Sequence, residues 1–188
     1  MTPFKGRRAL PPLSHDDVQA LALRYVGRYA TTRAKLRAYL ARKILERGWD
    51  DWREPDLEAI ANRFAELGYV DDSAYALSKS RSLTGRGYGK RRLQQKLHAA
   101  GVDDADGARA LDHADREAIA AALRFAERRK IGPFAASAPC DRKAREKAVA
   151  AMVRAGHAPP LAWAIASLGP GTEIDLGDLA EHARLTDA

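Results

Sequence analysis

Apolar side chains recur along most of the chain at the three- and four-residue intervals of one helix face. The stripes are Val18, Ala22, Tyr25 and Tyr29; Leu36, Leu40 and Ile44; Leu57, Ile60, Ala61, Phe64 and Leu67; Leu93 and Leu97; Ile119, Ala122 and Ala126; Leu161, Ile165 and Leu168. This spacing is typical of amphipathic helices. No segment alternates in the manner of a strand, so we expect an all-α fold with these residues, including Tyr25 and Tyr29, in its core.

Residues that favour helix ends separate these stripes. Glycine ends helices readily because it adopts positive φ, and we expect it to do so at Gly48, Gly68, Gly101, Gly132 and Gly156. Short polar side chains that accept hydrogen bonds from free backbone N–H groups favour helix starts at Thr32, Asp56, Asp72, Asp103 and Asp141.

A weak internal repeat accompanies the helical pattern. In each third of the chain, two apolar or small residues stand eight and four positions before a glycine: Leu40-Ile44-Gly48, Leu93-Leu97-Gly101 and Ala148-Met152-Gly156. Each of these predicted helices also carries surplus cations. Repeats too small to bury their own apolar faces stack on one another, so we expect an elongated helical array.

Positive charge is concentrated in the middle of the chain. The 188 residues have a net charge of +7, and their 46% hydrophobic content is sufficient for a core. No acidic residue occurs from Ser73 to Lys96, a stretch that contains Lys79, Arg81, Arg86, Lys90, Arg91, Arg92 and Lys96. Such a run predicts a polyanionic partner, most simply nucleic acid. The alternative is a solvated basic face without a ligand.

Several features of the sequence argue against a membrane or secreted protein. The longest apolar segment, Leu161 to Leu168, is far shorter than the roughly 20 residues that cross a bilayer. The basic start is followed by Pro11-Pro12 instead of an apolar signal segment. Cys140 is the only cysteine, so no internal disulfide can form, and we assign it no catalytic role. We expect a cytoplasmic protein.

Motifs for catalysis, metals or cofactors are absent. The glycines at Gly85, Gly87 and Gly89 lack the spacing of a phosphate-binding loop, and Arg91 occupies the position of its Ser or Thr. We expect a flexible turn there instead. The five histidines have no zinc-ligand spacing. The pair Asp71-Asp72 could serve catalysis, but capping of a helix start is the favoured interpretation. We predict no enzyme activity, no metal and no cofactor.

Aromatic residues offer one contact candidate. Tyr88 stands between two glycines in the basic run, where its ring could stack on a base. Trp49, Trp52 and Trp163 are interpreted as packing residues near helix junctions.

The chain resembles the RecX family of recombinase regulators, most clearly from Leu67 to Val102. The strongest match is Leu67-Gly68-Tyr69-Val70-Asp71-Asp72-Ser73-Ala74-Tyr75-Ala76, followed by the glycine-rich turn, Arg92-Leu93, Leu97 and Gly101-Val102. The segment from Leu23 to Leu40 is similar to the first repeat of that family, and Ala118 to Leu168 more loosely to the third. Lys35 and Lys96 depart from the family pattern, which usually has Glu there.

The resemblance implies three tandem three-helix repeats in an extended, curved molecule. We place them at residues 15–69, 70–113 and 114–169, with a flexible N-terminal arm at 1–14 and an acidic C-terminal tail at 170–188. It also implies a monomer that binds RecA filaments on single-stranded DNA and inhibits them, without a small-molecule substrate or a membrane. The candidates to face RecA or DNA are Arg33, Arg37, Lys43, Arg86, Tyr88, Lys90, Arg91, Arg92, Lys96, Lys143 and Lys147.

One other function is compatible with the residues themselves. A helical DNA- or RNA-binding protein without a recombinase partner would show the same basic helices. It would bind a duplex selectively through a recognition helix and would dimerise. Cations spread over three repeats favour backbone contacts over such base readout.

Overall fold

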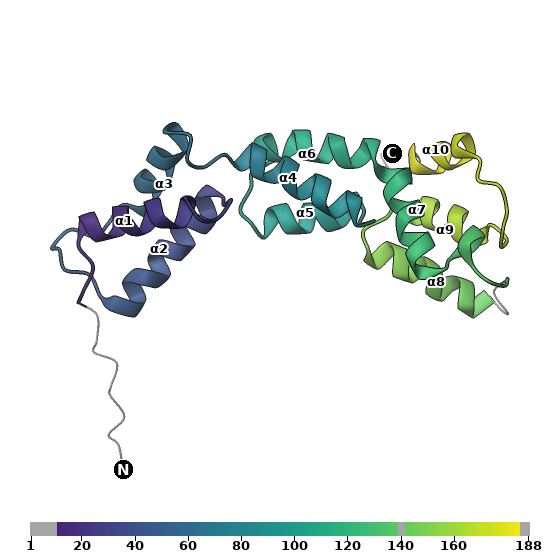
Figure 1. The fold of residues 1–188 in the computed structure, drawn as a ribbon, viewed down its shortest axis with the longest axis horizontal. Coiled ribbons are helices and arrows are strands. Elements are labelled where there is room, and N and C mark those ends of the chain that lie inside the picture. Colours follow the sequence, from purple (N-terminus) through teal and green to yellow (C-terminus); the bar gives the residue numbers. More distant parts are fainter. Residues whose placement is uncertain (1–10, 139–141, 185–188) are drawn as a thin grey trace, which may run out of the picture. The chain divides into compact units, whose positions relative to one another are not determined.

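The computed structural model describes residues 11–138 and 142–184, which form ten α-helices, one 3₁₀ helix and no strand (Figure 1). The α-helices are α1 (His15–Val26), α2 (Arg33–Arg47), α3 (Leu57–Glu66), α4 (Asp72–Gly85), α5 (Lys90–His98), α6 (Asp104–Arg116), α7 (Ala118–Arg129), α8 (Arg142–Arg154), α9 (Pro159–Ser167) and α10 (Leu176–Arg184). The 3₁₀ helix η1 is Gly132–Phe134. The all-α prediction is therefore confirmed.

The chain divides into two compact units, the first ending at Tyr75 and the second beginning at Ala76. In the first unit, α2 packs against α1 and α3 around a core that includes Val18, Leu36, Leu40 and Phe64. Leu13, which precedes α1, is fully buried in this core. Its N–H donates to the Gly48 carbonyl at 2.9 Å, so the chain before α1 is joined to the end of α2.

The second unit has two neighbouring cores. One lies among α4, α5 and α6 and includes Leu83, Leu93 and Leu97. The other surrounds α7, which packs against α8, α9 and α10. Leu179 of α10 is buried in this second core, so α10 is an integral part of the unit (Figure 1). Tyr88 packs against both cores.

Helix starts follow the capping chemistry expected from the sequence, with one correction. The side chains of Thr32, Asp56 and Asp103 cap α2, α3 and α6. Asp71, not Asp72, accepts from the Ala74 N–H at 2.7 Å at the start of α4. Asp141 and Cys140 lie outside the described residues. Four predicted stops are confirmed, since Gly48, Gly68, Gly101 and Gly156 follow helix ends and have positive φ. The fifth is wrong: Lys130, with φ 56°, caps the end of α7, and Gly132 begins η1.

Four residues predicted to pack in the interior are exposed instead. Tyr29 follows the end of α1, where helical spacing no longer applies; the residue is 53% exposed, and its ring lies tilted against that of Tyr25. Leu67 is the C-terminal cap of α3 and is 51% exposed. Trp52, in the loop before α3, is 93% exposed. Trp163, in α9, is 41% exposed, whereas Trp49 packs against the first core as predicted.

The repeat boundaries predicted from the sequence stay a prediction. The helices nevertheless occur in the order the repeat requires, because α2, α5 and α8 are each followed within three residues by one of the three glycines that define it.

Candidate nucleic-acid and protein interface

The glycine-rich turn before α5 interlocks with the turn between α8 and α9. The Gly89 N–H donates to the Ala155 carbonyl at 3.0 Å, and the Arg91 N–H donates to the Gly156 carbonyl at 3.2 Å. A Cβ on Gly89 would lie 2.3 Å from the Gly156 carbonyl oxygen. We call this contact between the two turns the glycine crossing.

The glycine crossing corrects the expectation of a flexible turn. Gly87 does have positive φ, 76°, as expected of a turn. Gly89, however, has an ordinary φ of −87° and is required by close approach instead. Because backbone hydrogen bonds join the two turns, the start of α5 is fixed to the turn between α8 and α9, and the cations that follow Gly89 have a rigid base.

His157 supports the crossing from the interior. It is only 2% exposed, and its Nε2 lies 3.1 Å from the Gly87 carbonyl oxygen. Burial lowers the pKa of His157 from 6.5 to about 4, outweighing the opposing effect of the bond to Gly87. The imidazole is therefore neutral near pH 7, and its Nε2–H donates to the carbonyl.

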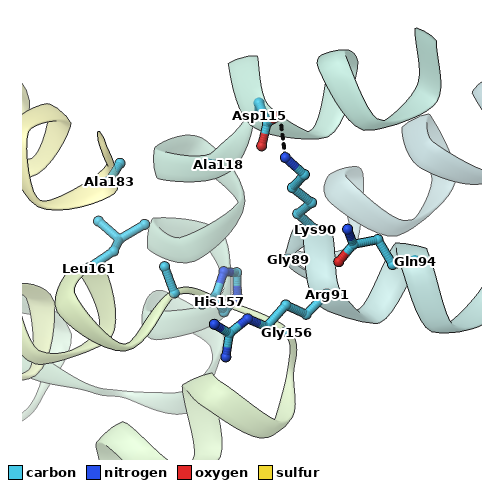
Figure 2. Close-up of a pocket in the computed structure, with 11 residues that line it drawn as sticks. Gly89, Lys90, Arg91, Gln94, Asp115, Ala118, Gly156, His157, Leu161 and Ala183 are labelled. Atoms are coloured by element: carbon cyan, nitrogen blue, oxygen red, sulfur yellow. Dashed lines mark hydrogen bonds and ion pairs between the residues drawn. The ribbon is translucent and has the colours of Figure 1, made fainter. Parts of the chain in front are cut away.

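A cleft of about 220 Å³ borders the crossing and is lined by residues of α5, α6, α7, α9 and α10 and of the two turns. Figure 2 shows Lys90 extended toward Asp115 and Arg91 reaching toward the turn at Gly156. Lys90 Nζ lies 2.6 Å from Asp115 Oδ2. Arg91 is exposed, and no carboxylate among the described residues lies within ion-pair distance of it. Arg91 is therefore the more available cation of the two.

The other second-repeat candidates lie on the same turn and helix. Arg86 donates from Nε to the Ser82 carbonyl at 3.0 Å and lies over the Tyr88 ring. Tyr88 itself is half-buried. Arg92 lies 3.4 Å from the Gln95 amide oxygen, and Lys96 is exposed further along α5. The structure thus brings Arg86, Tyr88, Lys90, Arg91 and Arg92 together around the crossing.

The first-repeat candidates are all paired with acids. The Arg33 backbone N–H and Nε donate to the two oxygens of Asp72, at 2.9 and 3.2 Å. Asp72 is 6% exposed, so this carboxylate serves the start of α2 from a buried position. Arg37 pairs with Glu58, and Lys43 pairs with Glu46 at 2.6 Å. These cations lie in the first unit and do not form one open basic patch.

The third-repeat candidates lie one turn apart on α8. Lys143 and Lys147 are both exposed. Within the described part of the chain, neither has a carboxylate at ion-pair distance. They are solvated cations on a single helix face.

Sequence reasoning missed a group of arginines that the structure assembles in the second unit. Arg128 and Arg129 from the end of α7 and Arg154 from the end of α8 line an open cavity of about 500 Å³ with Tyr88 and Phe125. We call these three residues the arginine cluster. The run Arg128-Arg129-Lys130 was the available signal, but nothing local indicated that Arg154 would lie beside it.

An apolar groove lies in the first unit. It has a volume of about 590 Å³ and is lined by α1 and α3 together with the turn after α3. Leu23, Leu67 and Tyr69 line it and are each about half exposed, at 51%, 51% and 54%. Exposed apolar side chains gathered on one groove are typical of surfaces that contact protein.

Comparison with known proteins gives a consistent family. The second three-helix domain of RecX matches residues 71–111, which contain the glycine-rich turn and α5. Regulatory protein RecX of Myxococcus xanthus is 29% identical over 166 residues, 81% of this chain and 85% of that protein. Regulatory protein RecX of Halorhodospira halophila is 35% identical over 129 residues, 68% of this chain and 73% of its own. The chain belongs to the RecX family.

A solved RecX structure shares the fold. Crystalline RecX from Lactobacillus salivarius superposes with a TM-score of 0.55 at 17% identity, covering 92% of this chain and 96% of its own. The three-helix repeats of the RecX fold, expected from the resemblance, are thereby confirmed. RecX proteins are regulatory proteins, not enzymes.

The described residues contain neither a metal-ion site nor a membrane-spanning helix. No group of three or more His, Cys, Asp and Glu side chains is arranged to hold a metal ion there. Among the same residues, no helix is both long and apolar enough to cross a bilayer.

Proposed function

We propose that this RecX protein binds RecA filaments on single-stranded DNA and mainly inhibits their recombinase and ATPase activities. The observation that carries the proposal is the set of available cations around the glycine crossing, in the segment that matches the second RecX domain. Arg91 extends from a rigid backbone, which lowers the entropy lost on binding.

Two different surfaces support a composite partner made of protein and nucleic acid. Exposed cations of the second unit are suited to phosphate contacts. The apolar groove bordered by Leu23, Leu67 and Tyr69 is suited to a protein surface. Individually weak contacts add through effective concentration when one chain engages both components of a filament. The protein would act without chemistry of its own and as a monomer.

Replacement of Arg91 and Arg92 together by Ala tests the proposal. Both side chains leave α5 beside the crossing, and neither has a carboxylate partner among the described residues. We expect weaker inhibition of RecA ATP hydrolysis with an unchanged thermal midpoint. Arg109→Ala with Arg116→Ala is the matched control, since both are exposed arginines of α6 and remove the same charge. Equal inhibition by both double variants would contradict the assignment.

The second candidate is a nucleic-acid-binding protein without a recombinase partner. The available cations favour it as much as they favour a filament. It predicts equal binding to bare DNA and no effect on RecA. If the protein pulls down RecA and lowers its DNA-dependent ATP hydrolysis, the RecA-filament proposal is supported over this second candidate.

A further inference from the structure

The arginine cluster has positive charge without matching negative charge. The Arg128 guanidinium donates to the Arg86 carbonyl, and Arg128 and Arg129 lie 5.6 and 5.8 Å from the Phe125 ring centroid. Arg129 and Arg154 have no hydrogen-bond partner among the described residues. None of the described residues that line the cavity is a carboxylate, so the three arginines that line it have no acid beside them there.

The position of these arginines at helix ends has an ordinary explanation as well. Arg128 and Arg129 are in the last turn of α7, and Arg154 is in the last turn of α8. A cation there offsets the negative end of the helix dipole by about 0.3–1 kcal/mol. That effect accounts for each arginine separately. It gives no reason for the two helix ends to meet at one open cavity or for an aromatic residue to border it.

Tyr88 adds a second kind of recognition to the cavity. Phe125 is only 4% exposed and serves as the platform against which Arg128 and Arg129 rest. Tyr88 is half-buried, and its hydroxyl has no partner among the described residues. An available ring edge and hydroxyl beside guanidinium groups suit a ligand that has both phosphate and an aromatic base.

We propose that the arginine cluster and Tyr88 form a binding site for single-stranded nucleic acid, with the phosphate held by Arg129 and Arg154 and a base beside Tyr88. The cavity of about 500 Å³ has room for one nucleotide. Arg128 is a positioning residue, because its bond to the Arg86 carbonyl fixes α7 to the turn that carries Tyr88. This site rests on the proposed function in that it supplies the nucleic-acid half of the composite partner.

The test measures fluorescence anisotropy of a 20-nucleotide deoxythymidine strand with the full chain alone, without RecA. Arg129→Ala combined with Arg154→Ala should weaken binding about tenfold at 0.1 M salt. It should also reduce the slope of log affinity against log salt by about 1.4, since each single-strand phosphate contact contributes about 0.7. Arg109→Ala with Arg116→Ala removes equal charge elsewhere in the unit and should change both quantities much less.

Tyr88 is tested separately, because its ring also packs between two cores. Tyr88→Leu should weaken binding of the deoxythymidine strand about tenfold, as expected for loss of an aromatic contact with a base. It should leave binding of inorganic polyphosphate within about twofold, since phosphate contacts are retained. Tyr88→Phe retains the ring and should bind the deoxythymidine strand as the wild type does, apart from the loss of a hydrogen bond made by the hydroxyl. Thermal melts of every variant exclude unfolding as the cause.

Three results would overturn the inference. Unchanged strand affinity with lower thermal stability would assign the arginines to the helix dipoles. Unchanged strand affinity with weaker RecA inhibition would assign the cluster to an acidic segment of a protein partner. If Arg109→Ala with Arg116→Ala weakens strand binding as much, the effect comes from the loss of net charge and not from a site. If wild-type protein fails to inhibit RecA but the cluster variant still loses strand binding, the filament proposal fails and this site stands.

Discussion

The two compact units differ in how many of their candidate cations are paired with acids. In the first unit, Arg37, Lys43 and Arg63 each pair with a glutamate, and Arg33 is joined to buried Asp72. In the second unit, Arg91, Lys96 and the arginine cluster have no carboxylate partner among the described residues. The first unit instead presents an apolar groove.

This difference shows that a cation can be present on the surface without being available to bind a phosphate. An exposed ion pair stabilises the fold by less than about 1 kcal/mol, but a phosphate must still displace the glutamate before it gains the cation. A cation without a partner carries no such cost. The sequence shows similar cation density in both regions, so only the acids brought near by folding distinguish a paired surface from an available one.

The glycine crossing gives the largest expected effect on stability. Gly89→Ala places a methyl group against the Gly156 backbone, which cannot move as a side chain can. We expect a loss of about 3 kcal/mol in urea unfolding. Gly85→Ala is the control, because a Cβ there meets nothing within 4 Å, and it should change stability by less than about 0.5 kcal/mol. Equal effects of the two changes would show that the turns do not interlock.

In the first unit, Asp72 joins the start of α4 to the start of α2 through charged hydrogen bonds to Arg33. Replacement of Asp72 tests this attachment. Asp72→Ala leaves the Arg33 N–H and guanidinium without their buried acceptor and should cost about 2–3 kcal/mol. The neighbouring Asp71→Ala removes only a helix cap and should cost about 1 kcal/mol. Chemical denaturation of both variants measures the difference. A larger loss at Asp71 would contradict this account of α2 and α4.

His157 makes the second unit sensitive to acid. Its folded-state pKa is about 4 and its ordinary value is 6.5. As pH falls from 6.5 to 4, the unfolded chain binds a proton that the folded chain does not, so stability is lost across this window and is fully present above it. The loss should reach about 3 kcal/mol at pH 4. His157→Gln should remove this part of the pH slope; an unchanged slope would show that His157 is not buried neutral.

Removal of the acids that pair with cations in the first unit should have the smallest effect of these changes, measured as a change in DNA affinity. Glu46→Gln with Glu58→Gln leaves Lys43 and Arg37 without partners. We expect single-stranded DNA affinity to rise about twofold, within the small range of exposed ion pairs. Asp50→Asn with Glu54→Gln gives the same change in net charge from two exposed acids of the same unit and should have less effect. A rise of equal size would show that pairing does not limit these cations.

Local chemistry accounts for the parts of the fold that the sequence predicts. The buried positions of Leu36, Leu40, Leu93 and Leu97 follow from helical spacing alone. Helix ends at glycines and caps at Thr32, Asp56 and Asp103 depend on residues three or four positions away. Periodicity fails where a helix ends, which is why Tyr29 and Leu67 are exposed.

Contacts between distant residues account for what the sequence does not predict. Asp72 reaches Arg33 across 39 positions, and His157 reaches Gly87 across 70. The arginine cluster needs the ends of α7 and α8 to converge. No local pattern records which helix ends meet, so the resemblance to RecX located the basic turn but not the cavity beside it.

The most direct test of the central claim is the rate of RecA ATP hydrolysis on single-stranded DNA with graded amounts of this protein. The account predicts a progressive fall in the rate, a weaker fall for Arg91→Ala with Arg92→Ala, and no such weakening for Arg109→Ala with Arg116→Ala. Unchanged hydrolysis at concentrations of wild-type protein that saturate bare DNA would contradict it.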